Sequence, residues 1–436
     1  MTLSSVPPSG FRDFLPKNLE LRQKVSQTIS RIYRSFGFEP IETSALENLE
    51  VLTGKGGGEN EKLIFKVLKR GEKLTEALEK SEELADLGLR FDLTLPLARF
   101  YAAHQNDLPK PFKAFHIAPV WRAERAQKGR YREFTQCDLD IIGSENWMAE
   151  VEVISAILAV FEKLSIKDVS VHLNDRALVY AALNQAGVPQ DRQVEVCITL
   201  DKLDKIGEKG VFAELHDKFS LDSTTVVNAA KLIMDKPAEI GKFDSIAPEQ
   251  ARGIKNILEK LKDAAGNQGQ NCFFNSSLMR GFDYYTGPVF EFRHPKLSGS
   301  LGGGGRYDRL LEKFGVPSIA ACGGSIGFER LILLLEELGH SDENLGPKFF
   351  IAVFSEEMLP QTLELSSKLR NLGQSVDLYP GSAKLKNQFK YADQKKARYA
   401  LILGPDEAKQ NQIRIKDLKT GIESLADFES LVKLPD

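Results

Sequence analysis

One strand pair constrains the fold more than any other part of the sequence. Phe112–Arg122 is an apolar run, Ala123–Gly129 is a charged loop, and Arg130–Ile142 then alternates between polar and apolar residues. This pattern predicts an antiparallel hairpin, because successive side chains on a strand point to opposite faces. One face of the second strand carries Arg130, Arg132, Phe134, Gln136, Asp138 and Asp140. A solvated face seldom orders such groups in a row, so we favour an active-site floor over plain solvation.

A second stretch, Met279–Glu291, places Arg280 among aromatics and glycines. The glycines allow a ligand to approach the backbone closely. Tyr284 and Tyr285 each offer a flat apolar ring with a polar tip, as residues of small-ligand pockets do. Taken alone, this stretch is equally compatible with a hairpin turn flanked by core aromatics.

Two further features bear on the site. The strict alternation of Leu89–Thr94 predicts a strand with Asp92 and Thr94 on one face, and Thr94 is expected to cap the helix that follows. The run Ser300–Asp308 contains consecutive glycines, but no Lys-Ser or Lys-Thr follows them as in a P-loop, and the spacing is wrong for a dinucleotide fingerprint. We expect these glycines to let a strand lie flat under a ligand.

A nearly apolar helix, Phe328–Leu338, carries Arg330. An unpaired buried charge is costly, so Arg330 needs an anionic partner, either a carboxylate of the protein or a phosphate of a ligand. Near the C-terminus the segment Lys384–Arg398 is basic, which is typical of a solvated face and also suits contact with an RNA backbone.

Composition excludes several classes of protein. The chain of 436 residues has a net charge of −3, so any nucleic-acid contact must rest on local patches. The 4 cysteines are far apart and form no C-x-x-C pair, which argues against a zinc site or a disulfide framework. No apolar run approaches membrane-spanning length. These features predict a cytoplasmic enzyme without a membrane partner.

The order of the patterns predicts a catalytic sheet interrupted by a helical module. The predicted domains are residues 1–173 and 271–340 for the two catalytic parts, 174–270 for the helical insertion, 341–347 for a linker, and 348–436 for a C-terminal α/β domain.

These stretches together resemble the class II aminoacyl-tRNA synthetases, and within them the histidyl-tRNA synthetases, over essentially the whole chain. Phe38–Leu46, Trp121–Phe134 and Gly324–Leu333 resemble class motifs 1, 2 and 3. Arg280–Tyr285 and Gly303–Asp308 resemble the two histidine-specific signatures. The segment around Asp92 is closer to the eukaryotic-like pattern, whereas the motif 2 loop is closer to the bacterial one.

The resemblance implies an α+β catalytic domain with an antiparallel sheet flanked by helices, a helical insertion and an anticodon-binding domain. It implies that histidine and ATP form a histidyl-adenylate, with Mg²⁺ bridging the ATP phosphates, and that histidine then passes to tRNA(His). Positioning and charge stabilisation would carry the rate, because this chemistry needs no enzyme nucleophile. A homodimer joined at motif 1 is expected.

The resemblance also assigns roles to single residues. The catalytic residues would be Arg280, Arg122 and Gln136. ATP would be bound by Arg122, Glu124, Arg130, Phe134 and Arg330, with Phe134 stacked on adenine. Histidine would be bound by Asp92, Thr94, Gln136, Asp140, Arg280, Tyr284 and Tyr285, with Asp140 and Tyr285 reading the imidazole. Gln127 and Arg132 would contact the tRNA acceptor end, and no metal-ligating residue is assigned.

Two alternatives have different functions. One is the non-catalytic regulatory subunit of an ATP phosphoribosyltransferase, which shares the catalytic fold but typically lacks the C-terminal domain and degrades the signatures. The other is a synthetase for another amino acid, such as proline or threonine, against which the Arg280–Tyr285 signature argues. Arg132 has an alternative too, since it shares a strand face with Arg130 and Phe134 and would then help to bind ATP.

Overall fold

The computed structural model describes residues 3–53, 59–126, 129–200, 202–219, 225, 228, 233, 239–279, 285–340, 346–381 and 383–435. The chain divides into two compact units, residues 1–338 and 339–436. Each unit has a sheet and a hydrophobic core of its own. Within the described ranges, no helix combines the length and apolarity needed to cross a membrane.

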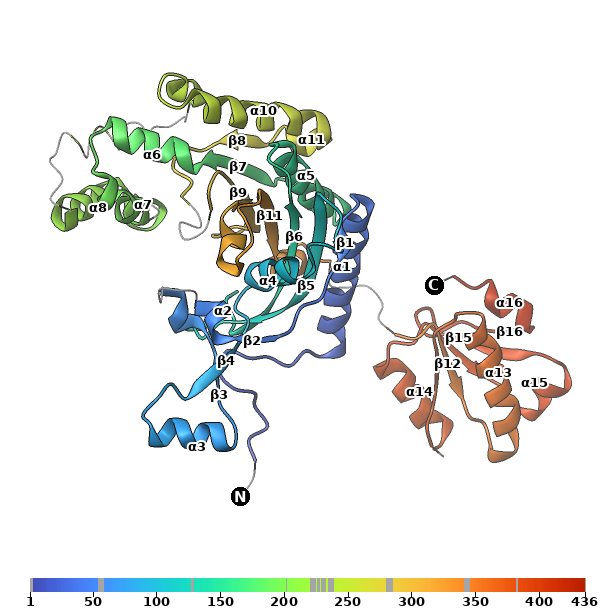
Figure 1. Ribbon diagram of the computed structural model, residues 1–436. Coiled ribbons are helices and arrows are strands. Elements are labelled where there is room, and N and C mark those ends of the chain that lie inside the picture. The colour runs from blue at the N-terminus through green and yellow to red at the C-terminus, as the bar shows by residue number, and fades with distance from the viewer. Residues whose placement is uncertain are drawn as a thin grey trace. The chain divides into compact units, whose positions relative to one another are not determined.

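The first unit is built around an eight-stranded sheet (Figure 1). Neighbouring strands are antiparallel except at the two edges, where β1 pairs with β5, and β7 with β8, in parallel. In spatial order the strands are β1 (Glu39–Pro40), β5 (Phe112–Trp121), β6 (Glu133–Ile142), β11 (Ala321–Gly327), β10 (Gly302–Arg306), β9 (Pro288–Arg293), β7 (Ser170–Asp175) and β8 (Cys272–Phe274). Pro40 lies in an edge strand, which suits a residue without a backbone N–H.

The predicted hairpin is confirmed as β5 and β6, which pair along their whole length. The apolar side of β6, with Cys137, Leu139 and Ile141, is buried in the main core. The polar side faces a cavity, so the alternation of the sequence separates the core from the site on a single strand.

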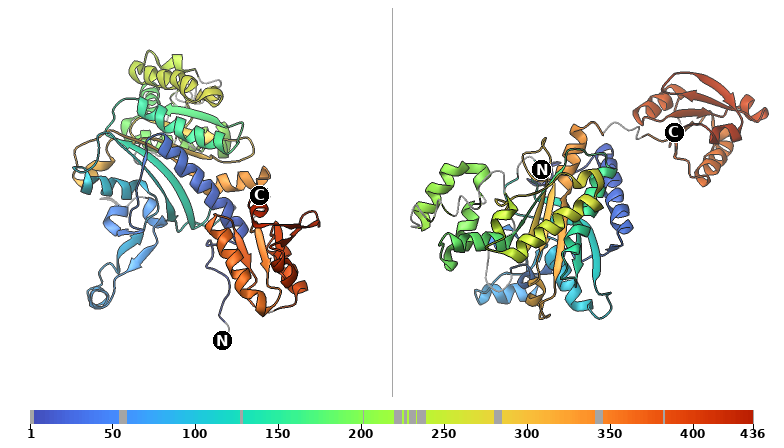
Figure 2. Two further views of the ribbon diagram at one scale, coloured as in Figure 1. Left: turned by 90° about the vertical axis from the view of Figure 1, so that its right-hand side faces the viewer. Right: turned by 90° about the horizontal axis from the view of Figure 1, so that it is seen from above.

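Helices pack against both faces of this sheet (Figure 2). The main core contains residues of α1 (Pro16–Ser35), α5 (Met148–Lys163) and α12 (Phe328–Glu337). On the opposite face, α4 (Thr94–His104) packs in a second cluster with Phe112 and Ala114 of β5. Gly37, with φ of 78°, ends the chain's first helical segment as expected.

Helices dominate the described part of the segment between β7 and β8. They are α6 (Arg176–Gln185), α7 (Gln193–Leu200), α8 (Leu203–Phe219), α10 (Pro248–Ala264) and α11 (Gly266–Gly269). Apolar residues of α6, α7 and α10 join the main core, as Leu178, Val196 and Ile257 do. The predicted domain boundaries within the first unit stay a prediction.

A small sheet of β2 (Leu46–Asn48), β4 (Ala85–Leu89) and β3 (Lys66–Leu68) also belongs to the first unit, with α2 (Leu49–Thr53) and α3 (Glu72–Glu79) near it in sequence. The predicted strand Leu89–Thr94 is wrong, because β4 ends at Leu89. Arg90 is instead drawn into the interior, where its guanidinium donates to the backbone oxygens of Thr43 at 2.7 Å and Pro119 at 3.0 Å. These bonds hold Arg90 in the segment between β4 and α4.

The second unit is an α/β domain on a mixed five-stranded sheet, as the sequence predicts. Its strands, in spatial order, are β13 (Val376–Leu378), β12 (Phe349–Ala352), β14 (Tyr399–Ile402), β15 (Ile413–Asp417) and β16 (Glu423–Ala426). β12 is parallel to both β13 and β14, whereas β15 is antiparallel to both β14 and β16. Its helices are α13 (Leu359–Asn371), α14 (Leu385–Gln394), α15 (Pro405–Lys409) and α16 (Phe428–Val432).

Candidate active site

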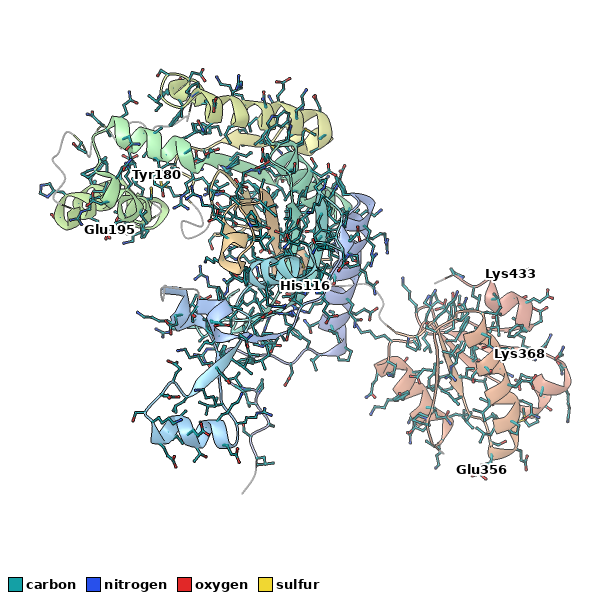
Figure 3. All side chains as sticks on the ribbon, viewed as in Figure 1. His116, Tyr180, Glu195, Glu356, Lys368 and Lys433 are labelled. Atoms are coloured by element: carbon teal, nitrogen blue, oxygen red, sulfur yellow. The ribbon has the colours of Figure 1, made fainter. Side chains whose placement is uncertain are left out.

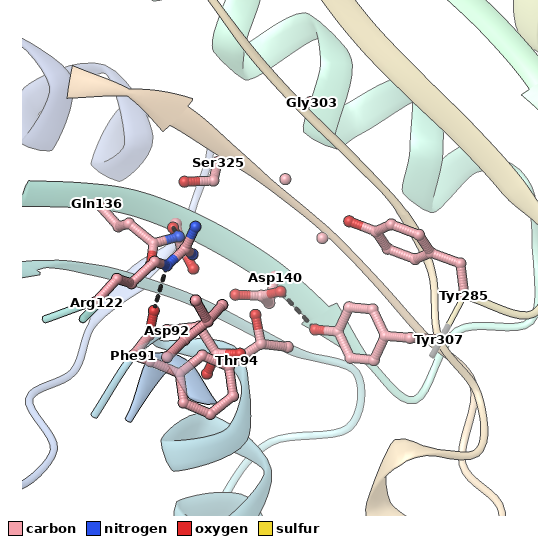
Figure 4. Close-up of a pocket in the computed structure, with 14 residues that line it drawn as sticks. Phe91, Asp92, Thr94, Arg122, Gln136, Asp140, Tyr285, Gly303, Tyr307 and Ser325 are labelled. Atoms are coloured by element: carbon pink, nitrogen blue, oxygen red, sulfur yellow. Dashed lines mark hydrogen bonds between the residues drawn. The ribbon is translucent and has the colours of Figure 1, made fainter. Parts of the chain in front are cut away.

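A cavity of about 240 Å³ lies over the polar side of the sheet in the first unit (Figure 4). Side chains from β6, β11 and the segment before α4 meet there. Its lining consists of Leu63, Phe91, Asp92, Thr94, Arg122, Gln136, Asp138, Asp140, Tyr285, Gly303, Tyr307, Gly323, Gly324 and Ser325. The structure therefore brings together six residues predicted to bind histidine or ATP: Asp92, Thr94, Arg122, Gln136, Asp140 and Tyr285.

Three predicted site residues, Arg280, Tyr284 and Gln127, lie outside the described residues. The remaining predicted residues, Glu124, Arg130, Arg132, Phe134 and Arg330, are described but do not line this cavity.

Asp140 lies deep in the cavity and is held by a tyrosine from another part of the chain. The hydroxyl of Tyr307 donates a hydrogen bond to Oδ1 of Asp140 (Figure 4). Burial raises the pKa of Asp140 to about 7, an effect that the Tyr307 bond opposes and the nearby Asp92 increases. A carboxyl group so oriented can accept a hydrogen bond from a polar group of a ligand.

Asp92 caps a helix as well as lining the cavity. Its Oδ1 accepts a hydrogen bond from the backbone N–H of Leu95 at 3.1 Å, in the first turn of α4. The expectation that Thr94 caps this helix is wrong, because α4 begins at Thr94 and Leu93 is in the cap position without a side-chain bond. Burial raises the pKa of Asp92, which the Leu95 bond partly offsets.

Asp138 and Gln136 lie side by side on the polar face of β6. Nε2 of Gln136 donates to Oδ1 of Asp138 at 3.4 Å. Ser325, which is opposite Asp138 on β11, also hydrogen-bonds to the Asp138 carboxyl. Burial and the neighbouring Asp140 raise the pKa of Asp138 well above its usual range.

Glycines give the cavity its depth at one wall. A Cβ added to Gly323 would lie 1.7 Å from Oδ1 of Asp140, and one added to Gly304 would lie 2.0 Å from the backbone oxygen of Gly323. Any larger residue at Gly323 would therefore collide with the Asp140 carboxyl. Gly303, Gly323 and Gly324 all line the cavity. Contact of a ligand with the strand that contains Gly303 stays a prediction.

Arg122 supplies a positive charge at the edge of the carboxylate cluster. Its Nε donates to the backbone oxygen of Phe91 at 2.9 Å (Figure 4). This bond holds the Nε end of the planar guanidinium group in place. The guanidinium carbon lies 5.0 Å from the centroid of the Phe134 ring. An arginine held in this way can present its other N–H groups to a phosphate or carboxylate.

The charged residues of the hairpin loop contact one another and the N-terminal segment. Arg130 lies 3.6 Å from Glu124 in an ion pair, with the Arg130 side chain 53% exposed. The side chain of Arg132 donates to the backbone oxygens of Glu124 and Ser9, each at 3.2 Å. The backbone N–H of Arg132 also donates to Gly10, so the N-terminal segment lies against this part of the chain.

Arg330 lies at the start of α12, directly after β11. Its Nη1 donates to the backbone oxygen of Ser300 at 2.7 Å. The preceding residue, Glu329, ties this helix to β6, because it pairs with Arg22 at 2.7 Å and accepts from the backbone N–H of Thr135. The Arg330 guanidinium therefore projects from a helix whose first turn is fixed against the site strand.

Three polar side chains of the cavity have no role in the sequence-based prediction: Asp138, Tyr307 and Ser325. Asp138 stood in the alternating polar face of β6, so its position was visible in the pattern. Tyr307 stood in the Gly303–Asp308 signature, but no local pattern linked it to Asp140. Ser325 follows the glycine pair of β11, where only the strand pairing places it opposite Asp138.

Family models match most of the chain. A model described as histidyl-tRNA synthetase matches residues 10–331, and one described as an anticodon binding domain matches residues 348–434. The chain belongs to the histidyl-tRNA synthetase family. This membership confirms the predicted fold class and enzyme class, an aminoacyl-tRNA ligase that charges tRNA with histidine.

Relatives and solved structures of this family cover the whole length. A histidine–tRNA ligase of Cytophaga hutchinsonii is 37% identical, over 98% of each chain. Another, from Christiangramia forsetii, is 36% identical over 97% of each chain. The crystal structure of the histidyl-tRNA synthetase of Nostoc sp. PCC 7120 is 27% identical with a TM-score of 0.84, covering 99% of this chain and 100% of that one.

A Bacillus halodurans structure titled as an ATP phosphoribosyltransferase regulatory subunit/histidyl-tRNA synthetase also matches, with a TM-score of 0.72 and coverage of 90% of this chain and 97% of that one. At 24% identity this likeness shows the fold alone. The regulatory-subunit alternative is not favoured, since the family model extends over the cavity residues and the curated histidyl relatives match across both units.

Proposed function

We propose that the cavity binds histidine and joins it to ATP as histidyl-adenylate, before the histidyl group passes to tRNA(His). The observation that carries this proposal is the meeting of Asp92, Gln136 and Asp140 with Arg122 around one cavity. Its carboxyl groups suit a ligand that bears an ammonium group and an imidazole, and the arginine suits the phosphate that must reach the substrate carboxylate.

Histidine is held at its two polar ends. Asp140, oriented by Tyr307, accepts a hydrogen bond from the imidazole, and Tyr285 lies beside it in the cavity wall. Asp92, Thr94 and Gln136 hold the α-ammonium group. Tyr284 and Arg280, assigned from the family signature, complete the histidine site.

ATP is bound at the Arg122 side of the cavity. Arg122 contacts the α-phosphate, while Phe134, which lies against the Arg122 guanidinium, stacks on adenine. Glu124 and Arg130 belong to the same loop, and Arg130 reaches the outer phosphates. Arg330, at the start of α12 directly after β11, also holds the phosphates.

The reaction needs no enzyme nucleophile. A carboxylate oxygen of histidine attacks the α-phosphorus of ATP, the bond to the β-phosphate oxygen breaks, and pyrophosphate leaves. Arg122 and Arg280 stabilise the negative charge that redistributes over the α-phosphate, and Gln136 helps to hold the substrate in line. A terminal ribose hydroxyl of tRNA then attacks the activated carbonyl carbon, and AMP leaves.

Mg²⁺ accompanies ATP in this proposal. Among the described residues, no group of three or more His, Cys, Asp or Glu side chains is placed to hold a metal ion. In this proposal the ATP phosphates would be the main ligands of Mg²⁺, and its positive charge would offset their negative charge. No step above is assigned to the ion.

The tRNA contacts follow the family assignment. Gln127 and Arg132 of the motif 2 loop contact the acceptor end, and the domain at residues 348–434 contacts the anticodon. The Arg132 side chain already donates hydrogen bonds to the backbone oxygens of Ser9 and Glu124. A contact between Arg132 and tRNA therefore has to form beside these bonds or replace them.

A homodimer and a cytoplasmic location complete the proposal. A groove of about 500 Å³ runs between α1 and the edge of the sheet, lined by Arg31, Arg34, Pro40, Ile41 and Phe115 among others. Edge strand β1 leaves this side of the sheet open to a second copy, and motif 1 coincides with it. Four buried cysteines without disulfides suit the reducing cytoplasm.

Pyrophosphate exchange tests the proposed reaction. Purified protein is incubated with Mg²⁺, ATP, labelled pyrophosphate and each amino acid in turn. Exchange with histidine alone is expected. Exchange with another amino acid would move the chain to a different synthetase, and no exchange with any of them would favour the regulatory subunit.

A further inference from the structure

The side-chain amide of Gln136 has two different ends, and the structure distinguishes them. Its Nε2 donates to Oδ1 of Asp138 at 3.4 Å. Its Oε1 is buried and, among the described residues, has no hydrogen-bond partner. A buried carbonyl oxygen normally finds a donor, so an unpaired one in the lining of a cavity is available to a ligand.

The orientation of this amide is set by the neighbour that contacts it. Asp138 is two residues further along β6 and therefore on the same face of the strand. A carboxyl oxygen that carries no proton accepts hydrogen bonds, so Oδ1 of Asp138 attracts the NH₂ end of the amide and repels the oxygen end. Turning the amide over would place two oxygens against each other and point the NH₂ group into the cavity.

The Asp138 side chain is itself held in place, so it can set the orientation of the Gln136 amide. Asp138 is 4% exposed, and Ser325 of β11 hydrogen-bonds to its carboxyl from the strand on one side. On the other side, its cross-strand neighbour on β5 is the buried His116, which makes no hydrogen bond to it. Burial and the bond from Ser325 therefore limit the rotation of the Asp138 side chain.

We propose that Asp138 is a positioning residue for histidine: it orients the Gln136 amide so that Oε1 faces the cavity and accepts a hydrogen bond from the substrate's α-ammonium group. The inference rests on the proposed role of Gln136 in binding that group. An ammonium group can only donate, so it is bound by the oxygen end of the amide and repelled by the NH₂ end.

Direct contact between Asp138 and the substrate is the competing explanation, because Asp138 also lines the cavity. The two explanations differ in one respect. A residue that acts only through Gln136 has no effect once the Gln136 amide is gone, whereas a residue that contacts the substrate keeps its effect.

A double-mutant cycle separates them. The Michaelis constants for histidine and for ATP are measured by pyrophosphate exchange for the parent, Asp138→Ala, Gln136→Ala and the protein with both changes. Asp138→Ala should raise the histidine constant about tenfold, the effect of one hydrogen bond, and leave the ATP constant within about twofold. In the Gln136→Ala background, Asp138→Ala should add less than about twofold. An undiminished tenfold effect in that background would overturn the inference.

Asp138→Asn is the conservative variant that tests orientation against charge. Asparagine keeps an oxygen that can accept from Nε2 of Gln136, so it should restore most of the histidine affinity that Asp138→Ala loses. If Asp138→Asn is as impaired as Asp138→Ala, the charge of Asp138 rather than its acceptor oxygen matters, and the inference is wrong.

Two controls distinguish a misfolded variant, failure of the proposed function and failure of the proposed role of Asp138. An unchanged ATP constant and an unchanged unfolding transition show that each variant is folded. If the parent itself shows no histidine-dependent exchange, the proposed function fails; if the parent is active and the cycle is additive, only the role of Asp138 fails.

Discussion

The hydroxyl of Tyr307 donates a hydrogen bond to the carboxyl of Asp140, from a residue 167 positions further along the chain. Asp140 belongs to β6, and Tyr307 follows β10 directly, so the bond joins the motif 2 strand to the second histidine signature. The Tyr307 ring lines the cavity while its hydroxyl holds the Asp140 carboxyl, for which we propose contact with the imidazole.

Tyr307→Phe should therefore weaken histidine binding while the protein stays folded. Losing one donor to a buried carboxyl should raise the Michaelis constant for histidine up to about tenfold, with little change for ATP. Tyr33→Phe is the matched control, since the buried Tyr33 hydroxyl meets the backbone oxygen of Cys137 on the core side of the same strand. Equal effects of both changes on histidine would show that Tyr307 acts through general packing.

Gly323→Ala should disturb the same carboxyl sterically. The added methyl group would lie 1.7 Å from Oδ1 of Asp140, which forces that side chain or the strand to move. We expect at least a tenfold loss of histidine activation in pyrophosphate exchange, about 1.4 kcal/mol. Gly253→Ala, in α10 with no atom near its added methyl group, should leave exchange unchanged. Parent-like exchange by Gly323→Ala would show that the cavity wall can yield.

A buried ion pair ties the second signature to α5. Arg306 donates to both carboxylate oxygens of Glu150, at 2.6 and 2.8 Å, and the Glu150 side chain is fully buried. Glu150→Ala would leave the Arg306 charge buried without this partner, so the free energy of unfolding should fall by about 3–5 kcal/mol.

Glu152→Ala provides the comparison on the same helix. Glu152 is 37% exposed and pairs with Lys113 at 2.6 Å, and its loss should cost no more than about 1 kcal/mol. Urea unfolding of both variants gives the two values. Similar losses of unfolding free energy in the two variants would mean that the buried Glu150–Arg306 pair stabilises the fold no more than the exposed Glu152–Lys113 pair.

His116 makes the fold sensitive to acid. It lies among the densely packed side chains of the first unit (Figure 3) and is 3% exposed, and neither ring nitrogen has a hydrogen-bond partner among the described residues. Burial, together with the charge of Arg90, lowers the pKa of His116 from its usual 6.5 to about 4.

The sign of the effect follows from these two values. Above pH 6.5 the ring is neutral in both states; between pH 6.5 and 4 only the unfolded chain binds the proton, so the free energy of unfolding falls as the pH falls. The loss from this residue should reach roughly 3 kcal/mol. His116→Phe removes the titrating ring, so its unfolding free energy should decline less between pH 7 and 4.5. Parallel pH curves for parent and variant would contradict the assignment.

The sequence predicted the parts of the site that depend on periodicity. Alternation along β6 placed Gln136, Asp138 and Asp140 on one face, because a strand has a strict two-residue repeat. The glycine runs likewise predicted strands that a ligand can approach. Local patterns of this kind need no knowledge of distant contacts.

Long-range contacts account for what the sequence did not predict. The Leu89–Thr94 pattern predicts a strand, but the Arg90 side chain finds acceptors at Thr43 and Pro119. Asp92 rather than Thr94 caps α4. Nothing near Arg132 in sequence indicated that Ser9 would accept from its side chain. Tertiary hydrogen bonds outweighed local preference at each of these positions.

The most direct test of the proposed chemistry is detection of the intermediate. Purified protein is mixed with Mg²⁺, ATP and histidine without tRNA, and the enzyme-bound product is analysed by mass spectrometry and then chased with tRNA(His). We expect histidyl-adenylate that transfers its histidine to the tRNA, and a large loss of this product in Asp140→Ala at limiting histidine. Absence of the adenylate in the parent, or unchanged formation in Asp140→Ala at the same histidine concentration, would contradict histidine activation in this cavity.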